Sequence, residues 1–234
     1  MSDTLSLYGY NGPYYTSTAD NSVRVLTATV TTSTGAVPWT ARGLVLNGLL
    51  QQDAPNVVVT AVLSGVGGQV LATVTGTVPM TLRPGEPGPF QLSAVAPAST
   101  VASVAYSVAM GTTTAPVPRT LRVDNNWEAP AGVRPPFSNP AYSDLDPTGT
   151  AEPDVSGGMI TNDGATAIAS PSVTSAWFDA TGHVVFWATT PLVDAAGARI
   201  ASLAPGAAAQ FVLNAGANAP DLSTLVKGTW AYAS

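Results

Sequence analysis

The only histidine of the chain, His183, is the first residue to consider for acid–base or metal chemistry. A hydrolase triad would use it as a base beside an activated serine, but the sequence holds no G-x-S-x-G elbow. Transition metals need several histidine or cysteine ligands, and the chain has one histidine and no cysteine. Because few residues can do acid–base or nucleophilic work, we expect a protein that is not an enzyme.

Carboxylates gather in the segment DLDPTGTAEPD, which contains Asp144, Asp146 and Asp154. Oxygen donors at this spacing could bind calcium, and Gly149 could give the bend that a calcium loop needs. The segment is not an EF-hand loop, because Pro147 stands where that loop carries a ligand. We therefore expect a hydrated loop and no cofactor, with calcium as the alternative.

Lys227 is the single lysine and lies in the run STLVKGTWAYA. A lysine buried beside an asparagine and an acid can form an intramolecular isopeptide bond. With one lysine in the whole chain, we expect instead that the side chain lies along a sheet with its ammonium group in water.

The tryptophans could form a platform on which sugar rings stack. Trp177 and Trp187 would face each other across a hairpin only if the strand registers agree. We expect the tryptophans to pack in the core, with carbohydrate binding as the alternative. The set consists of Trp39, Trp127, Trp177, Trp187 and Trp230.

Residues 1–20 form an arm that contains Tyr8, Tyr10, Tyr14 and Tyr15. Tyrosine gives rigid contact area at a low entropic cost, so binding surfaces use it often. In one interpretation the arm is an N-terminal strand whose rings pack on the first domain. In the other, the tyrosines bind a protein partner, because an arm can add a strand to a neighbour's exposed sheet edge.

Composition narrows the possible partners. The chain of 234 residues has a net charge of −6 and a pI near 4.4, and its few cations form no cluster. We therefore expect no nucleic acid and no anionic membrane surface as a partner. No apolar run reaches the ~18–20 residues of a membrane helix, and Met1–Thr4 lacks the pattern of a signal peptide.

One strand-turn-strand unit occurs twice along the chain. In both copies a Leu-x-Pro-Gly turn precedes a phenylalanine, as in Leu82–Phe90 and Leu203–Phe211. The first turn is expected to lead into a strand at Phe90. Short alternating runs such as Val23–Val30 and Val101–Val108 predict strands, and no helical stripe persists for a helix. We predict an arm at 1–20, a β-sandwich at 21–111, a Thr/Pro linker at 112–118 and a second β-sandwich at 119–234. Within the second, the proline-rich stretch 129–154 predicts a long loop without regular strands.

The second copy resembles a known family. It reads G-x-I-x-N-x-G at 158–164, S-A-W-F-D-A-T-G-H-V-V at 175–185 and L-A-P-G-x-x-x-x-F-V-L at 203–213. This series resembles the FxLYD-type domain, an immunoglobulin-like β-sandwich of bacterial envelope and exported proteins. The first copy departs from it, because Ser64 replaces Asp179 and no clear Asn-x-Gly precedes it.

The resemblance implies an all-β chain of two tandem Ig-like antiparallel β-sandwich domains and no catalytic residues. We therefore predict a structural or adhesive module of a bacterial cell surface or extracellular assembly, outside the cell or in its envelope. One alternative is a subunit of a self-assembling particle or fibre, such as a phage virion or appendage. Another is a carbohydrate-binding module. The partner would be a second copy, a surface protein or a carbohydrate.

Overall fold

The computed structural model describes residues 10–11, 21–31, 38–95, 97, 99–129, 155–215, 220–222 and 224–233. The described residues form antiparallel strands and no helix, so the predicted all-β sandwich-type fold is confirmed. The chain divides into two compact units. The N-terminal unit consists of residues 14–117 with 181–184, and the C-terminal unit consists of residues 1–13, 118–180 and 185–234.

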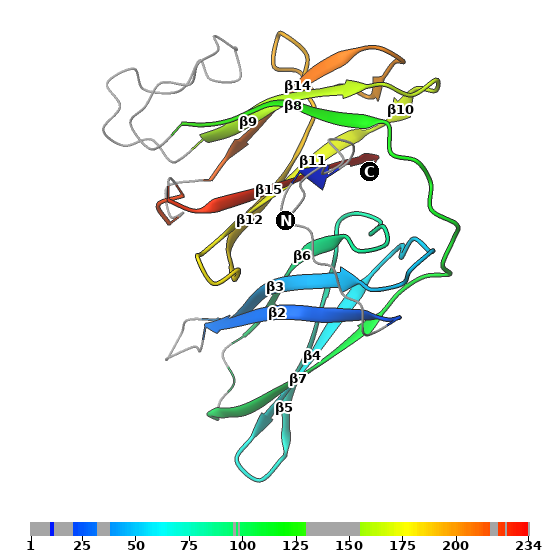
Figure 1. Ribbon diagram of the computed structural model, residues 1–234. Helices are drawn as coiled ribbons and strands as arrows, with labels where there is room; N and C mark the ends of the chain where they lie inside the picture. The colour runs from blue at the N-terminus through cyan, green and yellow to red at the C-terminus, as the bar shows by residue number, and fades with distance from the viewer. Residues whose placement is uncertain are drawn as a thin grey trace, which may run out of the picture. The chain divides into compact units, whose positions relative to one another are not determined.

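The N-terminal unit has two sheets of three strands each (Figure 1). One sheet has the order β2-β3-β6, and the other has the order β5-β4-β7. The strands are β2 (Val23–Thr31), β3 (Trp39–Asn47), β4 (Val58–Gly65), β5 (Val70–Thr77), β6 (Pro87–Ala94) and β7 (Val101–Ala109).

The C-terminal unit repeats this plan and adds to it. One sheet has the order β8-β9-β14, the other has the order β12-β11-β15-β1, and β10 pairs with β13. The strands are β1 (Tyr10–Asn11), β8 (Leu121–Ala129), β9 (Val155–Asn162), β10 (Ile168–Ala169), β11 (Pro171–Phe178), β12 (Val184–Pro191), β13 (Ser202–Leu203), β14 (Ala208–Asn214) and β15 (Val226–Ala233).

The strands of the two units correspond in chain order. Strands β2, β3 and β6 match β8, β9 and β14, and strands β5, β4 and β7 match β12, β11 and β15. Strand β15 therefore corresponds to β7, which is an outer strand of its sheet in the N-terminal unit. The difference is that β1 pairs with β15, whereas β7 pairs only with β4 among the described strands.

The repeated Leu-x-Pro-Gly turn has the same hydrogen bonds in both units. Gly85 has a φ of 75° and donates its N–H to the carbonyl of Asn47 at 2.8 Å. Gly206 has a φ of 71° and donates to the carbonyl of Asn162 at 2.7 Å. A positive φ favours glycine, which explains why both copies keep this residue after the proline.

A buried asparagine holds each of these turns. The Asn162 amide group donates to the carbonyls of Thr166 at 2.8 Å and Leu203 at 3.0 Å, and its oxygen accepts from the Gly164 N–H at 3.0 Å. The side chain is fully buried, and its bond to Leu203 is buried as well, so it satisfies a backbone carbonyl inside the core. We call this arrangement the asparagine latch.

The N-terminal unit has the same latch, which the sequence analysis did not find. The Asn47 amide group donates to the carbonyls of Gln52 and Leu82 at 2.9 Å each, and its oxygen accepts from the Leu49 N–H at 3.0 Å. Asn47 is followed by Gly48 and Leu49, so the Asn-x-Gly signal of the other copy is missing. The latch itself does not require a second glycine.

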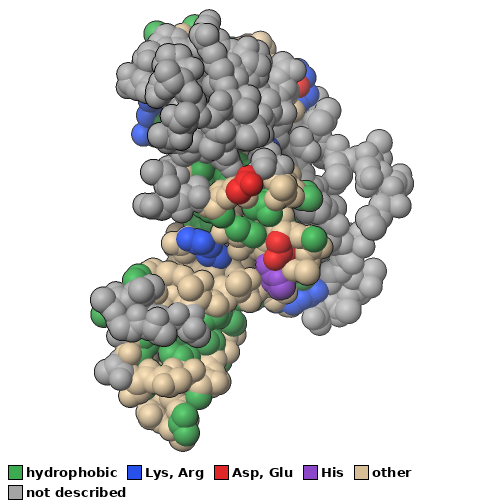
Figure 2. All heavy atoms as spheres, turned by 90° about the vertical axis from the view of Figure 1, so that its left-hand side faces the viewer, with side chains coloured by type: hydrophobic (Ala, Val, Ile, Leu, Met, Phe, Trp, Pro, Cys, Tyr) green, Lys and Arg blue, Asp and Glu red, His purple; other side chains and the backbone are tan. Residues whose placement is uncertain are grey.

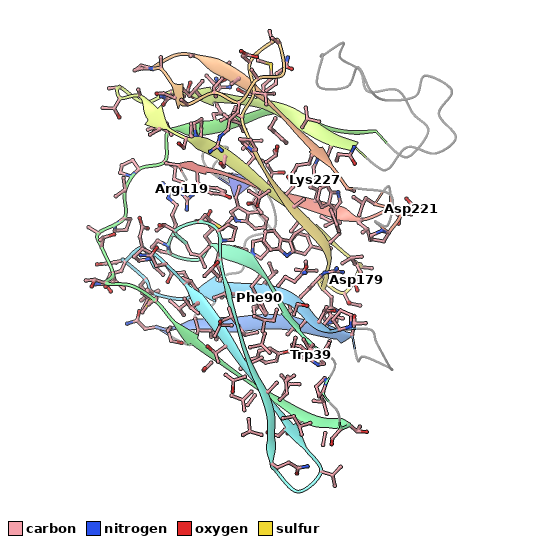
Figure 3. The ribbon with its side chains drawn as sticks, turned by 180° about the vertical axis from the view of Figure 1, so that it is seen from behind. Trp39, Phe90, Arg119, Asp179, Asp221 and Lys227 are labelled. Carbon is pink, nitrogen blue, oxygen red and sulfur yellow. The ribbon has the colours of Figure 1, made fainter. Side chains whose placement is uncertain are left out.

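A glycine opposite a phenylalanine completes the repeat. A Cβ atom at Gly158 would lie 2.8 Å from Phe211 Cε1, and one at Gly43 would lie 2.8 Å from Phe90 Cε1. Both phenylalanine rings are buried, and Phe90 is labelled in Figure 3. The glycine, which lies opposite the phenylalanine in the strand register, leaves the space that the ring fills.

Some strand boundaries differ from the predictions. Strand β6 begins at Pro87, whereas the sequence analysis began it at Phe90, because an edge strand tolerates proline. Strand β8 extends to Ala129, so the expected loop without strands cannot begin there. The rest of that expected loop, residues 130–154, lies outside the described residues.

The end of the N-terminal unit is bonded along a short loop of the same unit. Gly111 donates its N–H to the carbonyl of Pro55 at 2.9 Å, and Thr114 forms a backbone bridge with Asp53. The buried Asp53 carboxylate accepts from the Val117 N–H at 3.0 Å. Much of the predicted linker segment is therefore fixed on the unit that precedes it.

Candidate functional site

The structure describes only some of the predicted site residues. Asp144, Asp146 and Asp154, the candidate calcium ligands, lie outside the described residues. Among the arm tyrosines, Tyr8, Tyr14 and Tyr15 also lie outside them. The fourth, Tyr10, begins β1. Its backbone pairing is described, so the site is built from this strand and its partner.

Strand β1 extends a sheet of the C-terminal unit. It pairs antiparallel with β15, with Tyr10 opposite Trp230 and Asn11 opposite Thr229. The described backbone of the arm therefore pairs with the C-terminal unit, whereas the packing of the tyrosine rings lies outside the described side chains. An outer strand presents unpaired N–H and C=O groups along its edge, and any extended segment that reaches them can form the ladder. Sequence order alone does not reveal which edge a distant segment reaches.

Hydroxyl groups support β15 on its neighbour β11. Thr229 and Ser175 bond at 3.0 Å through their hydroxyl oxygens, and both side chains are buried. The Tyr232 hydroxyl bonds to Thr174 at 2.8 Å, and Thr174 also bonds to Thr189 at 2.6 Å. Burial raises the pKa of Tyr232, and the hydrogen bonds oppose this rise. These hydroxyl groups hydrogen-bond to one another and so hold β15, the strand with which β1 pairs, on β11.

Strand β15 also contains Lys227, which is labelled in Figure 3. Its Nζ donates to the Ser156 hydroxyl of β9 at 2.7 Å, so it bonds across to the opposite sheet. This corrects the expectation of an ammonium group that lies only in water. A serine beside a lysine can act as a nucleophile, but Ser156 is 2% exposed and a substrate cannot reach its hydroxyl. The contact therefore links the two sheets.

His183 lies in the turn between β11 and β12. Its Nδ1 bonds to the Thr181 hydroxyl at 2.7 Å, a short-range contact between residues two positions apart. Within the described part of the chain, no group of three or more His, Cys, Asp or Glu residues could hold a metal ion. The local contact is typical of a side chain that stabilises a hairpin turn.

Several tryptophans are buried in the core. Trp39, Trp177 and Trp230 are at most 1% exposed, so a sugar ring cannot stack on them. Trp177 packs on Phe186 with ring centroids 5.6 Å apart. Because side chains alternate along a strand, Trp187 lies on the other face of β12, and the two tryptophans do not face each other.

No protein-family model matches the chain, and no curated protein matches it. Among the described residues, no helix is both long and apolar enough to span a membrane. Function is therefore argued from the strands and their edges.

Proposed function

We propose that the protein is a non-enzymatic structural module that binds other proteins through the edges of its sheets. Its setting would be a bacterial cell surface or an extracellular assembly, as the resemblance to FxLYD-type Ig-like domains implies. The observation that carries the proposal is β1, a short strand from the arm that adds to the edge of β15. Strand addition gives affinity through backbone hydrogen bonds and needs no catalytic residue.

A second candidate function is a subunit of a self-assembling particle or fibre, such as a virion or an appendage. The pairing of β1 favours it as well, because an arm that pairs within one chain can pair in the same way with a second chain. The burial of Trp39, Trp177 and Trp230 supports a structural role over carbohydrate binding. Calcium in the acidic loop remains a proposal that a melting curve with and without the ion would test.

Light scattering tests the assembly role. The mass in solution is measured for the full chain and for a chain that lacks residues 1–20. We expect a multimer that becomes smaller without the arm. Monomers in both cases would remove the particle or fibre candidate and leave a surface module whose partner is a different protein.

A further inference from the structure

Strand β7 has an outer edge that differs from several outer edges of the other described sheets. It pairs only with β4, and none of its residues is buried. Its sequence VASVAYSVA has no charged residue and no proline. Soluble proteins normally protect an open edge with charges, prolines or a covering segment, so an edge without them is a candidate for strand addition.

Several outer strands of the other sheets are protected. Strand β2 carries Arg24, β8 carries Arg122 and Asp124, and β12 ends in Pro191. Strand β14 is bridged by Val193, which pairs with Gln210. These features are the usual means of preventing strand addition, and among the outer strands of the β5-β4-β7 sheet neither β7 nor β5 has them.

Strands β5 and β6 approach each other closely at the side of the N-terminal unit away from β7. A Cβ atom at Gly76 of β5 would lie 2.5 Å from the Gln91 carbonyl oxygen of β6. Strand β2 also comes close to β7, so proximity to the other sheet does not distinguish the two edges. The choice of the β7 edge rests on the match between β7 and β15.

The C-terminal unit shows that this position accepts a strand. Strand β15 matches β7 in the order of its sheet, and β1 pairs antiparallel with its outer edge. The middle of β15 is buried, whereas β7 is at least partly exposed along its whole length. The same sheet position is thus filled in one unit and open in the other.

We infer that β7 pairs with β7 of a second copy of this chain, which joins the two β5-β4-β7 sheets into one continuous sheet. The inference rests on the proposed structural role and names the edge that an assembly would use. Two identical edge strands can always pair antiparallel about a two-fold axis, and most homo-oligomers have this symmetry.

The side chains of β7 suit this pairing. Centred on Ala105, the pair brings Ser103 opposite Ser107 and Val104 opposite Tyr106, so no charged side chains meet across it. Each copy has a net charge of −6, and most contacts between copies would bring like charges together. Strands β4, β5 and β7 contain no charged residue. In the view of Figure 2, the lower part of the molecule, where Figure 1 has these strands, shows hydrophobic and uncharged polar side chains.

A single cysteine tests the inference directly, because the natural chain has none. Ala105→Cys would place two thiols on the symmetry axis, with Cα atoms about 4.5–5.5 Å apart, within the range of a disulfide. The matched control is Thr73→Cys, an exposed position on β5 of the same sheet. Under mild oxidation we expect a covalent dimer of the first variant and not of the second. Equal cross-linking of both variants would overturn the inference.

Charge gives a second, independent measurement. In Ser103→Lys/Ser107→Lys, two pairs of lysines would lie opposite each other across the axis. The control is Thr73→Lys/Thr75→Lys, with the same charge added at exposed sites on β5. We expect the dissociation constant of the full-chain dimer, from light scattering over a concentration series, to rise about tenfold in the first variant only. A full chain that stays monomeric at every concentration would also overturn the inference.

The two proposals fail in different ways. If removal of residues 1–20 dissolves a multimer but Ala105→Cys forms no specific dimer, the arm assembles the protein and the β7 edge does not. If the specific dimer forms and the arm has no effect on mass, the β7 edge holds and arm-driven assembly fails.

Discussion

The asparagine latch gives the most direct test of the repeated architecture. In Asn162→Asp, a carboxylate replaces the amide group that donates to the carbonyls of Thr166 and Leu203. An ionised carboxylate has no proton to donate, so both carbonyls lose their donor and face a negative charge, and the Leu203 carbonyl does so in a buried position. The bond from the Gly164 N–H can persist, because the oxygen that accepts it remains.

The size of the effect follows from the number of lost bonds. A buried group left without its partner costs about 1–3 kcal/mol, and of the two bonds only the one to Leu203 is buried, so the free energy of unfolding should fall by about 2 kcal/mol at neutral pH. Domains are stable by about 5–15 kcal/mol, so the variant would lose a measurable part of its stability. Asn47→Asp should have a similar effect in the N-terminal unit, where the same pair of bonds exists.

The loss should depend on pH in a defined direction. Burial and the two carbonyls raise the pKa of the new carboxyl above its usual ~3.9, so the folded state binds its proton more tightly than the unfolded state. Below the raised pKa the group is neutral, and the deficit relative to the natural chain becomes smaller as pH falls toward ~3.9. A deficit that grows on acidification would contradict this reasoning.

Urea unfolding, followed by tryptophan fluorescence and circular dichroism at several pH values, measures these changes. Asn214→Asp, at an exposed position, is the control and should change the free energy of unfolding by no more than about 0.5 kcal/mol. A loss below about 1 kcal/mol for Asn162→Asp would show that the latch does not hold the turn.

Three further predictions test other contacts. Tyr232→Phe should cost about 1 kcal/mol at neutral pH, because the bond to Thr174 is lost. Because burial raises the pKa of Tyr232, the natural chain should lose stability as pH rises above ~10, and the variant should lose less; equal alkaline loss in urea titrations would refute this. Gly158→Ala places a methyl group against a buried ring and should cost about 1–3 kcal/mol in thermal unfolding, whereas an unchanged melting temperature would mean that the ring moves freely. Asp53→Ala removes the acceptor of the Val117 N–H, so limited proteolysis should cut residues 112–117 faster than in the natural chain; an unchanged cleavage rate would argue against a fixed segment.

The sequence predicted the fold class because strands of this protein alternate and end at clear turns. Runs such as Val23–Thr31 and Val101–Ala109 have the apolar alternation of half-buried strands, and the glycine turns separate them. Proline misled the prediction at Pro87, since the rule that proline interrupts a ladder does not apply at an edge. Two-residue strands such as β1 carry no periodic signal, and only a distant partner defines them.

The candidate site was less accessible to sequence reasoning. The arm tyrosines suggested a binding element, but the edge that it meets depends on three-dimensional proximity. The equivalence of Asn47 and Asn162 was missed because the residues after them differ, although the bonds they make are the same. The candidate edge of β7 becomes visible only when the strand orders of the two units are compared.

The pairing of β1 with β15 has a mechanical consequence. Because Tyr10 pairs with Trp230 and Asn11 pairs with Thr229, the N-terminal end of β1 and the C-terminal end of β15 lie at the same end of the pair. A force that pulls these two ends apart would break the hydrogen bonds between β1 and β15 one after another rather than all together. The strand would therefore detach at low tension, before the strands within either compact unit separate.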